Sequence, residues 1–120
     1  MKLLKILLFL LILPTQNLFS SPYLMDPMPN KKPAPDFVLV GLDGKEHSLT
    51  ELRGKFALIN FWATWCTPCK AEMPSLESIH NTLKNDDFTV VGIHVGPRPD
   101  AINNYLSLNP VTFPIFIDMD

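Results

Sequence analysis

The stretch FALINFWATWCTPCKAEMPSL, residues 56–76, decides the fold because it joins two patterns of different period. Residues 56–63 form a near-continuous apolar run, which is typical of a strand covered on both faces in a parallel α/β sheet. From Met73 onward the apolar residues recur at helical spacing. The stretch therefore predicts a buried strand followed directly by a helix that runs from about Cys66 to Lys84.

The flanking sequence continues this alternation. Upstream, Asp43-Gly44 is a strong signal for a hairpin turn. Downstream, the patterns predict a strand over 88–95, a helix over 98–109 and a strand over 115–117. The order hairpin, strand, helix, strand, helix, strand predicts an α/β fold built as a three-layer sandwich.

Length and composition limit the function classes. The chain has 120 residues, a formal net charge of -2 and 47% hydrophobic residues, which indicates one folded domain and excludes disorder throughout. Because no basic patch is present, we expect no nucleic-acid partner.

The N-terminus is typical of an export signal. Lys2 and Lys5 provide a positive start, and residues 6–13 form an apolar run that Pro14 ends. This run is shorter than the roughly 17–25 apolar residues that a membrane-spanning helix needs. We expect residues 1–20 to be a signal peptide, with an uncleaved membrane anchor as the alternative.

Between this segment and the domain lies a proline-rich linker, residues 21–35, with five prolines in fifteen residues. Proline at this density opposes both helix formation and sheet pairing. The folded domain is therefore expected over residues 36–120.

The chain contains two cysteines, Cys66 and Cys69. A structural zinc site usually needs four protein ligands, and covalent haem attachment needs a histidine directly after the second cysteine, where this chain has Lys70. The three histidines are scattered and lack a paired spacing: His47, His80 and His94. A disulfide that closes so short a loop constrains little of the unfolded chain. We therefore expect no metal and no cofactor, and a dithiol that performs chemistry.

The strand-to-helix position suits such chemistry. At a helix N-terminus, free N–H groups and the positive end of the dipole should lower the pKa of the Cys66 thiol from about 8.5 to roughly 3.5–7.5. Cys69, one turn later, would be close enough to resolve a mixed disulfide. Pro68 fits the first helical turn, where a missing N–H costs nothing.

These motifs resemble a known family. The stretch 56–76, together with APDFVLVGLDGKEHSLTELRGK before it and VVGIHVG and FPIFID after it, is similar to exported TlpA/ResA-like thiol–disulfide oxidoreductases of the thioredoxin fold, which are related to the AhpC/TSA proteins. The resemblance covers about residues 34–120. It implies that Cys66 attacks, that Cys69 resolves, and that Trp65 shields the disulfide.

The resemblance also implies supporting residues. Glu72 matches an acidic residue near the active site of ResA-like members; alternatively it is a solvated first-turn acid that complements the helix dipole. Asn60 stands where cytosolic thioredoxins carry a buried aspartate; it is also expected to be a hydrogen-bonded polar residue in a strand. Pro74 matches a helix-kinking proline. His94 is expected to be a satisfied core or rim histidine.

By the same resemblance, the protein would reduce disulfides in exported proteins such as apocytochrome c. Its electrons would come from a membrane thiol donor, and it would act in the periplasm or at the outer face of the cytoplasmic membrane, with membrane association through the N-terminus. A peroxiredoxin is the first alternative, but that class needs Thr or Ser three residues before its cysteine, where this chain has Ala63. An inactive fragment or a binding module is the second.

The resemblance further implies a missing C-terminal third, comprising a cis-proline loop, the last strands and the last helix. In the family's sheet order, the strands present would run 115–117, 88–95, 56–62. The strand before the cysteines would then be an edge strand, and Phe56, Ile59 and Phe61 would lose part of their cover.

Overall fold

The computed structural model describes residues 28–120. All of its helices and strands lie in the compact unit Ala34–Asp120. The expected signal peptide and residues 21–27 of the expected linker lie outside the described residues. Within the described part, no helix combines the length and the apolar character needed to cross a bilayer.

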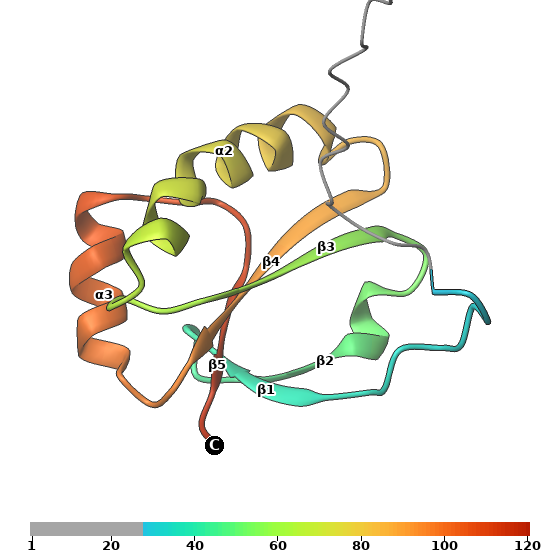
Figure 1. Ribbon diagram of the computed structural model, residues 1–120, viewed down its shortest axis with the longest axis horizontal. Coiled ribbons are helices and arrows are strands. Elements are labelled where there is room, and N and C mark those ends of the chain that lie inside the picture. Colours follow the sequence, from blue (N-terminus) through green and yellow to red (C-terminus); the bar gives the residue numbers. More distant parts are fainter. Residues whose placement is uncertain (1–27) are drawn as a thin grey trace, which may run out of the picture. The chain divides into compact units, whose positions relative to one another are not determined.

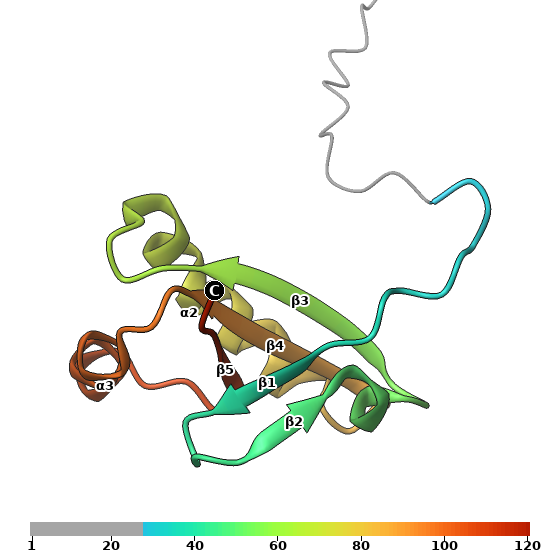
Figure 2. The same ribbon diagram turned by 90° about the horizontal axis from the view of Figure 1, so that it is seen from below.

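The unit is an α/β fold with a five-stranded sheet in the order β2-β1-β5-β4-β3 (Figures 1 and 2). Strands β3, β4 and β5 are parallel, and the antiparallel hairpin β1–β2 pairs with β5. The predicted strand order is therefore confirmed, with β3 at the edge of the sheet. The elements are β1 Val38–Gly41, β2 Glu46–Ser48, the 3-10 helix η1 Leu49–Leu52, β3 Phe56–Trp62, α2 Thr67–Leu83, β4 Phe88–Val95, α3 Pro99–Leu108 and β5 Ile115–Asp118.

The predicted N-terminal hairpin turns at Asp43-Gly44, where Gly44 has a φ of 77° that favours glycine. His47 holds the hairpin together, because its two ring nitrogens lie 3.0 Å from the Glu51 carboxylate and 3.2 Å from that of Asp43. These hydrogen bonds, the one to Glu51 foremost, raise the pKa of His47. The ring also stacks on Phe116 of β5, which joins the hairpin to the sheet.

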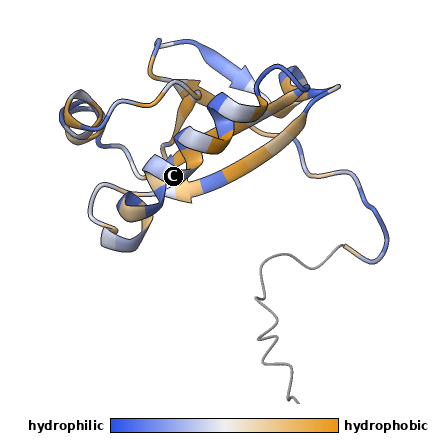
Figure 3. Ribbon diagram, turned by 90° about the horizontal axis from the view of Figure 1, so that it is seen from above, coloured by the Kyte–Doolittle hydropathy of each residue, from blue (hydrophilic) through white to orange (hydrophobic). Residues whose placement is uncertain are grey.

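Two apolar clusters lie on opposite faces of the sheet. Helices α2 and α3 cover the larger one through Met73 and Ile102, which are fully buried. Residues before and within the hairpin, with Leu52 of η1, cover the smaller one around Val91 and Ile93. Figure 3 shows the apolar residues concentrated in the central strands, with polar residues on the outer side of α2.

Strand β3 is less covered than its apolar sequence indicates. Phe56 is 78% exposed and Phe61 is 62% exposed, whereas Trp62 is buried. Only one long side of β3 pairs with another described strand, and the smaller cluster reaches no further along it than Ile59. The prediction of cover on both faces is therefore wrong for Phe56 and Phe61, whereas the loss of cover that the resemblance implied is confirmed for these two residues.

Candidate active site

The two cysteines lie at the edge of the sheet where the parallel strands end. The last residues of β3, β4 and β5 are Trp62, Val95 and Asp118, and residues 63–66 lead from β3 into α2. In open α/β sheets this carboxyl edge is the usual place for a functional site. The predicted strand–helix junction is confirmed, with Cys66 as the N-cap residue of α2.

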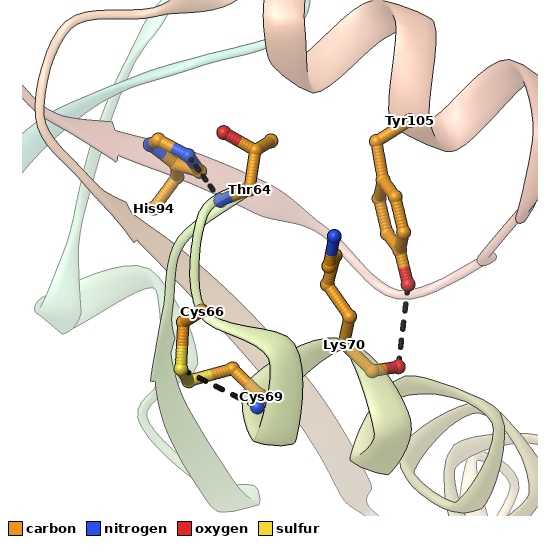
Figure 4. The surroundings of a disulfide bond; sticks show 6 residues. All are labelled: Thr64, Cys66, Cys69, Lys70, His94 and Tyr105. Atoms are coloured by element: carbon orange, nitrogen blue, oxygen red, sulfur yellow. Dashed lines mark hydrogen bonds between the residues drawn. A yellow bond between two sulfur atoms is a disulfide. The ribbon is translucent and has the colours of Figure 1, made fainter.

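Cys66 and Cys69 form a disulfide with a Cα–Cα distance of 5.3 Å (Figure 4). The Cys69 N–H donates to Cys66 Sγ over 3.4 Å, so one of the free donors of the helix start points at this sulfur. Both cysteines are half-buried, and Pro68 is exposed in the first turn. The helix start thus presents a disulfide sulfur to an N–H donor and to the positive end of the helix dipole.

A small apolar pocket of about 150 Å³ adjoins the disulfide. Trp65 lines it, but its side chain is 72% exposed. The pocket therefore offers an apolar contact surface directly beside both sulfurs. Its lining residues are Phe61, Trp62, Ala63, Trp65, Cys66, Cys69 and Val95.

His94, at the end of β4, fixes the segment before the cysteines. Its side chain is fully buried, and its Nε2 accepts a hydrogen bond from the Thr64 N–H over 3.1 Å. Its Nδ1 lies 3.0 Å from the Gly96 carbonyl, to which it donates. Burial, opposed by the Gly96 bond and helped by the charge of Arg98, lowers the pKa of His94. The neutral ring with its proton on Nδ1 satisfies both contacts.

The prediction of a satisfied core histidine is thus correct for the hydrogen bonds of His94, but it missed the contact with the segment before the cysteines. The parallel register, which pairs Trp62 with His94, is the signal that could have shown it. A polar residue one strand away from the end of the cysteine-bearing strand is well placed to bond that segment.

Tyr105 of α3 bonds to the second turn of α2. Pro74 lies inside α2 and has no N–H, so it cannot donate to the Lys70 carbonyl four residues earlier. The Tyr105 hydroxyl donates to that carbonyl over 3.3 Å, and the Lys70 ammonium lies 6.0 Å from the centre of the Tyr105 ring (Figure 4). A side chain of the neighbouring helix therefore replaces the backbone bond that the proline removes.

Close packing fixes Trp62 directly before the site. Its indole lies at right angles to the His94 ring, with the ring centres 5.0 Å apart, and 5.4 Å from the Tyr105 ring. A Cβ added to Gly92 would lie 3.2 Å from Trp62 Nε1 and 2.7 Å from the end of the Ile115 side chain. Glycine at position 92 therefore leaves room for the side chains of Ile115 and Trp62.

Two supporting residues differ from their expected surroundings. Glu72 is exposed and lies in the second turn of α2, because the helix begins only at Thr67. The first turn contains no acidic residue, so the alternative that Glu72 is a first-turn acid is wrong. The side-chain nitrogen of Asn60 is buried and has no hydrogen-bond partner in residues 28–120, contrary to the expectation of a hydrogen-bonded strand residue.

Fold and site together define a thioredoxin-like domain with a Cys-x-x-Cys disulfide at the start of a helix. The family model described as the AhpC/TSA family matches residues 31–120. The chain belongs to this family.

Several thiol–disulfide oxidoreductases are similar to this chain. The chain is similar to the thiol–disulfide oxidoreductase ResA of Geobacillus thermodenitrificans, with 40% identity over 85 residues, 71% of this chain and 49% of the relative. ResA of Bacillus subtilis is 38% identical over 87 residues, which are 72% of this chain and 49% of that relative. The chain thus spans about half the length of these relatives.

Among solved structures, a thiol:disulfide interchange protein of the thioredoxin family from Chlorobium tepidum matches with a TM-score of 0.67 and 36% identity, over 79% of this chain and 64% of that one. A secreted disulfide oxidoreductase from Mycobacterium tuberculosis matches with a TM-score of 0.62 and 32% identity, over 70% of this chain and 61% of that one. The thioredoxin-like fold inferred from the sequence is therefore confirmed.

Proposed function

We propose that the protein is a thiol–disulfide oxidoreductase that exchanges disulfides through Cys66 and Cys69. The observation that carries the proposal is the placement of this pair, with Cys66 Sγ facing the Cys69 N–H at the start of α2. Such a position favours the thiolate, which is the attacking form of cysteine. The similarity to ResA supports the same activity.

In the reducing direction, the exchange consists of two successive attacks of a thiolate on a disulfide. The Cys66 thiolate attacks one sulfur of a substrate disulfide, which forms a mixed disulfide and releases the other substrate sulfur as a thiolate. The Cys69 thiol then loses its proton and attacks Cys66 Sγ. This second attack re-forms the Cys66–Cys69 disulfide and releases the reduced substrate. Two electrons pass to the substrate, and a thiol donor must return them.

The supporting residues have proposed roles in this exchange. Trp65 and the apolar pocket would contact the substrate chain around its disulfide, because they adjoin both sulfurs. Pro68 would keep the first turn of α2 rigid. Glu72 and Asn60 would act near the site, Glu72 from the exposed side of α2 and Asn60 from β3.

The experiment compares single cysteine variants. After reduction, Cys66 should react with iodoacetamide faster than Cys69 at neutral pH, because its sulfur alone faces the helix N-terminus. Cys69→Ser should accumulate a mixed disulfide with a disulfide-containing protein such as insulin, and Cys66→Ser should not. Equal alkylation rates in the folded protein, or trapping by Cys66→Ser alone, would overturn the assignment of roles.

We further propose that the protein is exported and works in the periplasm or at the outer face of the cytoplasmic membrane. Residues 1–20 would act as a signal peptide or as an anchor, residues 21–35 as a linker, and residues 36–120 as the redox domain. The substrates would be exported proteins with disulfides, apocytochrome c among them, and a membrane thiol donor would supply electrons. The secreted relative from Mycobacterium tuberculosis supports this location.

Fractionation of expressing cells tests the location. The chain should be found outside the cytoplasm, either shortened by about twenty residues in its intact mass or at full length in the membrane fraction. Full-length protein in the cytosol would contradict the proposal.

A further inference from the structure

His94 contacts the segment before the cysteines from the neighbouring strand. The Thr64 N–H, two residues before Cys66, donates to His94 Nε2 over 3.1 Å (Figure 4). His94 Nδ1 donates to the Gly96 carbonyl over 3.0 Å. Both ring nitrogens therefore have a hydrogen-bond partner, and Nε2 bonds to the segment that connects β3 to Cys66.

The bond to Thr64 exists in only one protonation state. Neutral imidazole with a proton on Nδ1 has a lone pair on Nε2, whereas in the imidazolium both nitrogens carry protons. A proton on Nε2 would face the proton of the Thr64 N–H, and the bond would be lost. Because the ring is fully buried, a displaced Thr64 N–H would need a new partner or access to water.

We propose that His94 is a positioning residue for the cysteine pair: its neutral ring holds the Thr64 N–H and thereby the approach to Cys66, and protonation of Nε2 releases that segment. The proposal rests on the proposed thiol–disulfide exchange for its meaning, but the hydrogen bond can be tested without it. Neither the position nor the chemistry of His94 requires a bound ligand.

The surroundings of the ring favour the neutral form. Trp62 lies across it from β3, Ile117 is its paired residue on β5, and Tyr105 of α3 packs against Trp62. Arg98 is the charged side chain that acts on the ring. The titratable groups of the adjoining segment are the two cysteines, joined here as a disulfide. A protonated His94 ring would place a second positive charge near that of Arg98. No carboxylate of residues 28–120 bonds to the ring to compensate for it.

The direction of the pH effect follows from these surroundings. Burial, the largest cause, lowers the pKa of His94 below its ordinary value of 6.5, against the raising effect of the Gly96 bond. The hydrogen bond should therefore be intact at pH 7 and above. It should be lost as the pH falls from 6.5 through the lowered pKa.

The first test is an NMR titration of the full oxidised chain. The Thr64 amide signal and the His94 Nε2 signal should move together, with one midpoint below pH 6.5. In His94→Gln, a side-chain oxygen can accept from Thr64 at every pH, so the Thr64 signal should show no such midpoint. A Thr64 signal that ignores the titration of His94 would overturn the proposal. The wild-type measurement alone decides the matter if the variant does not fold.

The second test links the bond to the disulfide. The rate at which the phosphine TCEP reduces the Cys66–Cys69 bond is compared between wild type and His94→Gln from pH 4.5 to 8. The ratio of the two rates should be constant above pH 6.5 and should change by about two- to tenfold below it, the range that one lost hydrogen bond represents. A ratio that does not vary with pH would show that the segment has no influence on the cysteines. Failure of insulin trapping by Cys69→Ser would instead count against the proposed function, since neither test here uses a protein substrate.

Discussion

Replacing Tyr105 with phenylalanine should test the compensation between the two helices. The change removes the hydroxyl that donates to the Lys70 carbonyl over 3.3 Å, and it keeps the ring that packs 5.4 Å from Trp62. A neutral hydrogen bond contributes about 0.5–1.5 kcal/mol net. Because the half-buried Lys70 carbonyl would have no helical donor, we expect a loss in the upper half of that range, about 1–1.5 kcal/mol.

The decisive comparison is made in a Pro74→Ala background. Alanine restores the N–H that can donate to the Lys70 carbonyl within α2, so the tyrosine hydroxyl becomes redundant. Tyr105→Phe should then cost less than about 0.5 kcal/mol. The free energies of unfolding come from urea titrations of the four proteins, read as a double-mutant cycle.

Ser107→Ala is the matched control, because it removes an exposed hydroxyl of α3 that bonds only within its own helix. It should change stability by less than about 0.5 kcal/mol. Equal costs of Tyr105→Phe with and without Pro74 would refute the reasoning, since the bond would then not replace the one that proline removes.

Three further outcomes are expected. Gly92→Ala should destabilise the fold by about 1–3 kcal/mol in urea titrations, because a Cβ there crowds Ile115 first and Trp62 next; unchanged stability would show that the Ile115 side chain or the strand can shift. Partial burial of Glu77 raises its pKa, but the hydrogen bonds from Thr112 outweigh this effect and lower the pKa below 4.5. In thermal melts at acid pH, the wild type should therefore lose stability as the pH falls through that lowered pKa. Glu77→Gln should not show this loss. Phe61→Lys should reduce light scattering of concentrated protein, because it places a charge on an exposed apolar edge strand; more scattering would contradict this.

Much of the fold could be predicted from periodicity. The strand over 88–95 has the predicted boundaries, and the helix that follows the cysteines lies within one residue of its predicted ends, because long patterns of a single period are the least ambiguous signals. The helix starts at Thr67, one residue after the predicted Cys66, and Pro68 lies in its first turn as expected. The hairpin could be predicted from Asp43-Gly44, because this pair is strongly favoured in the tight turns that join two antiparallel strands.

Contacts between distant segments could not be predicted in the same way. The bond from Tyr105 to the Lys70 carbonyl depends on how α3 lies against α2, and nothing in either segment alone fixes that arrangement. The contact of His94 with Thr64 depends on the register between β3 and β4, which a shift by one residue would remove. The exposure of Phe61 was expected from the family's sheet order and not from the apolar run of β3, which by itself indicates cover on both faces.

The hydrogen bond at the start of α2 has an electrochemical consequence. The Cys69 N–H reaches Cys66 Sγ over 3.4 Å in the disulfide, where sulfur is a weak acceptor. After reduction the same sulfur can ionise, and a hydrogen bond to a charged acceptor is about twice as strong. An added stabilisation of the reduced state by about 0.5–1.5 kcal/mol corresponds to about 10–30 mV for a two-electron couple. We therefore expect this backbone amide, by its own contribution, to make the folded pair a stronger oxidant than the same four residues in a flexible peptide.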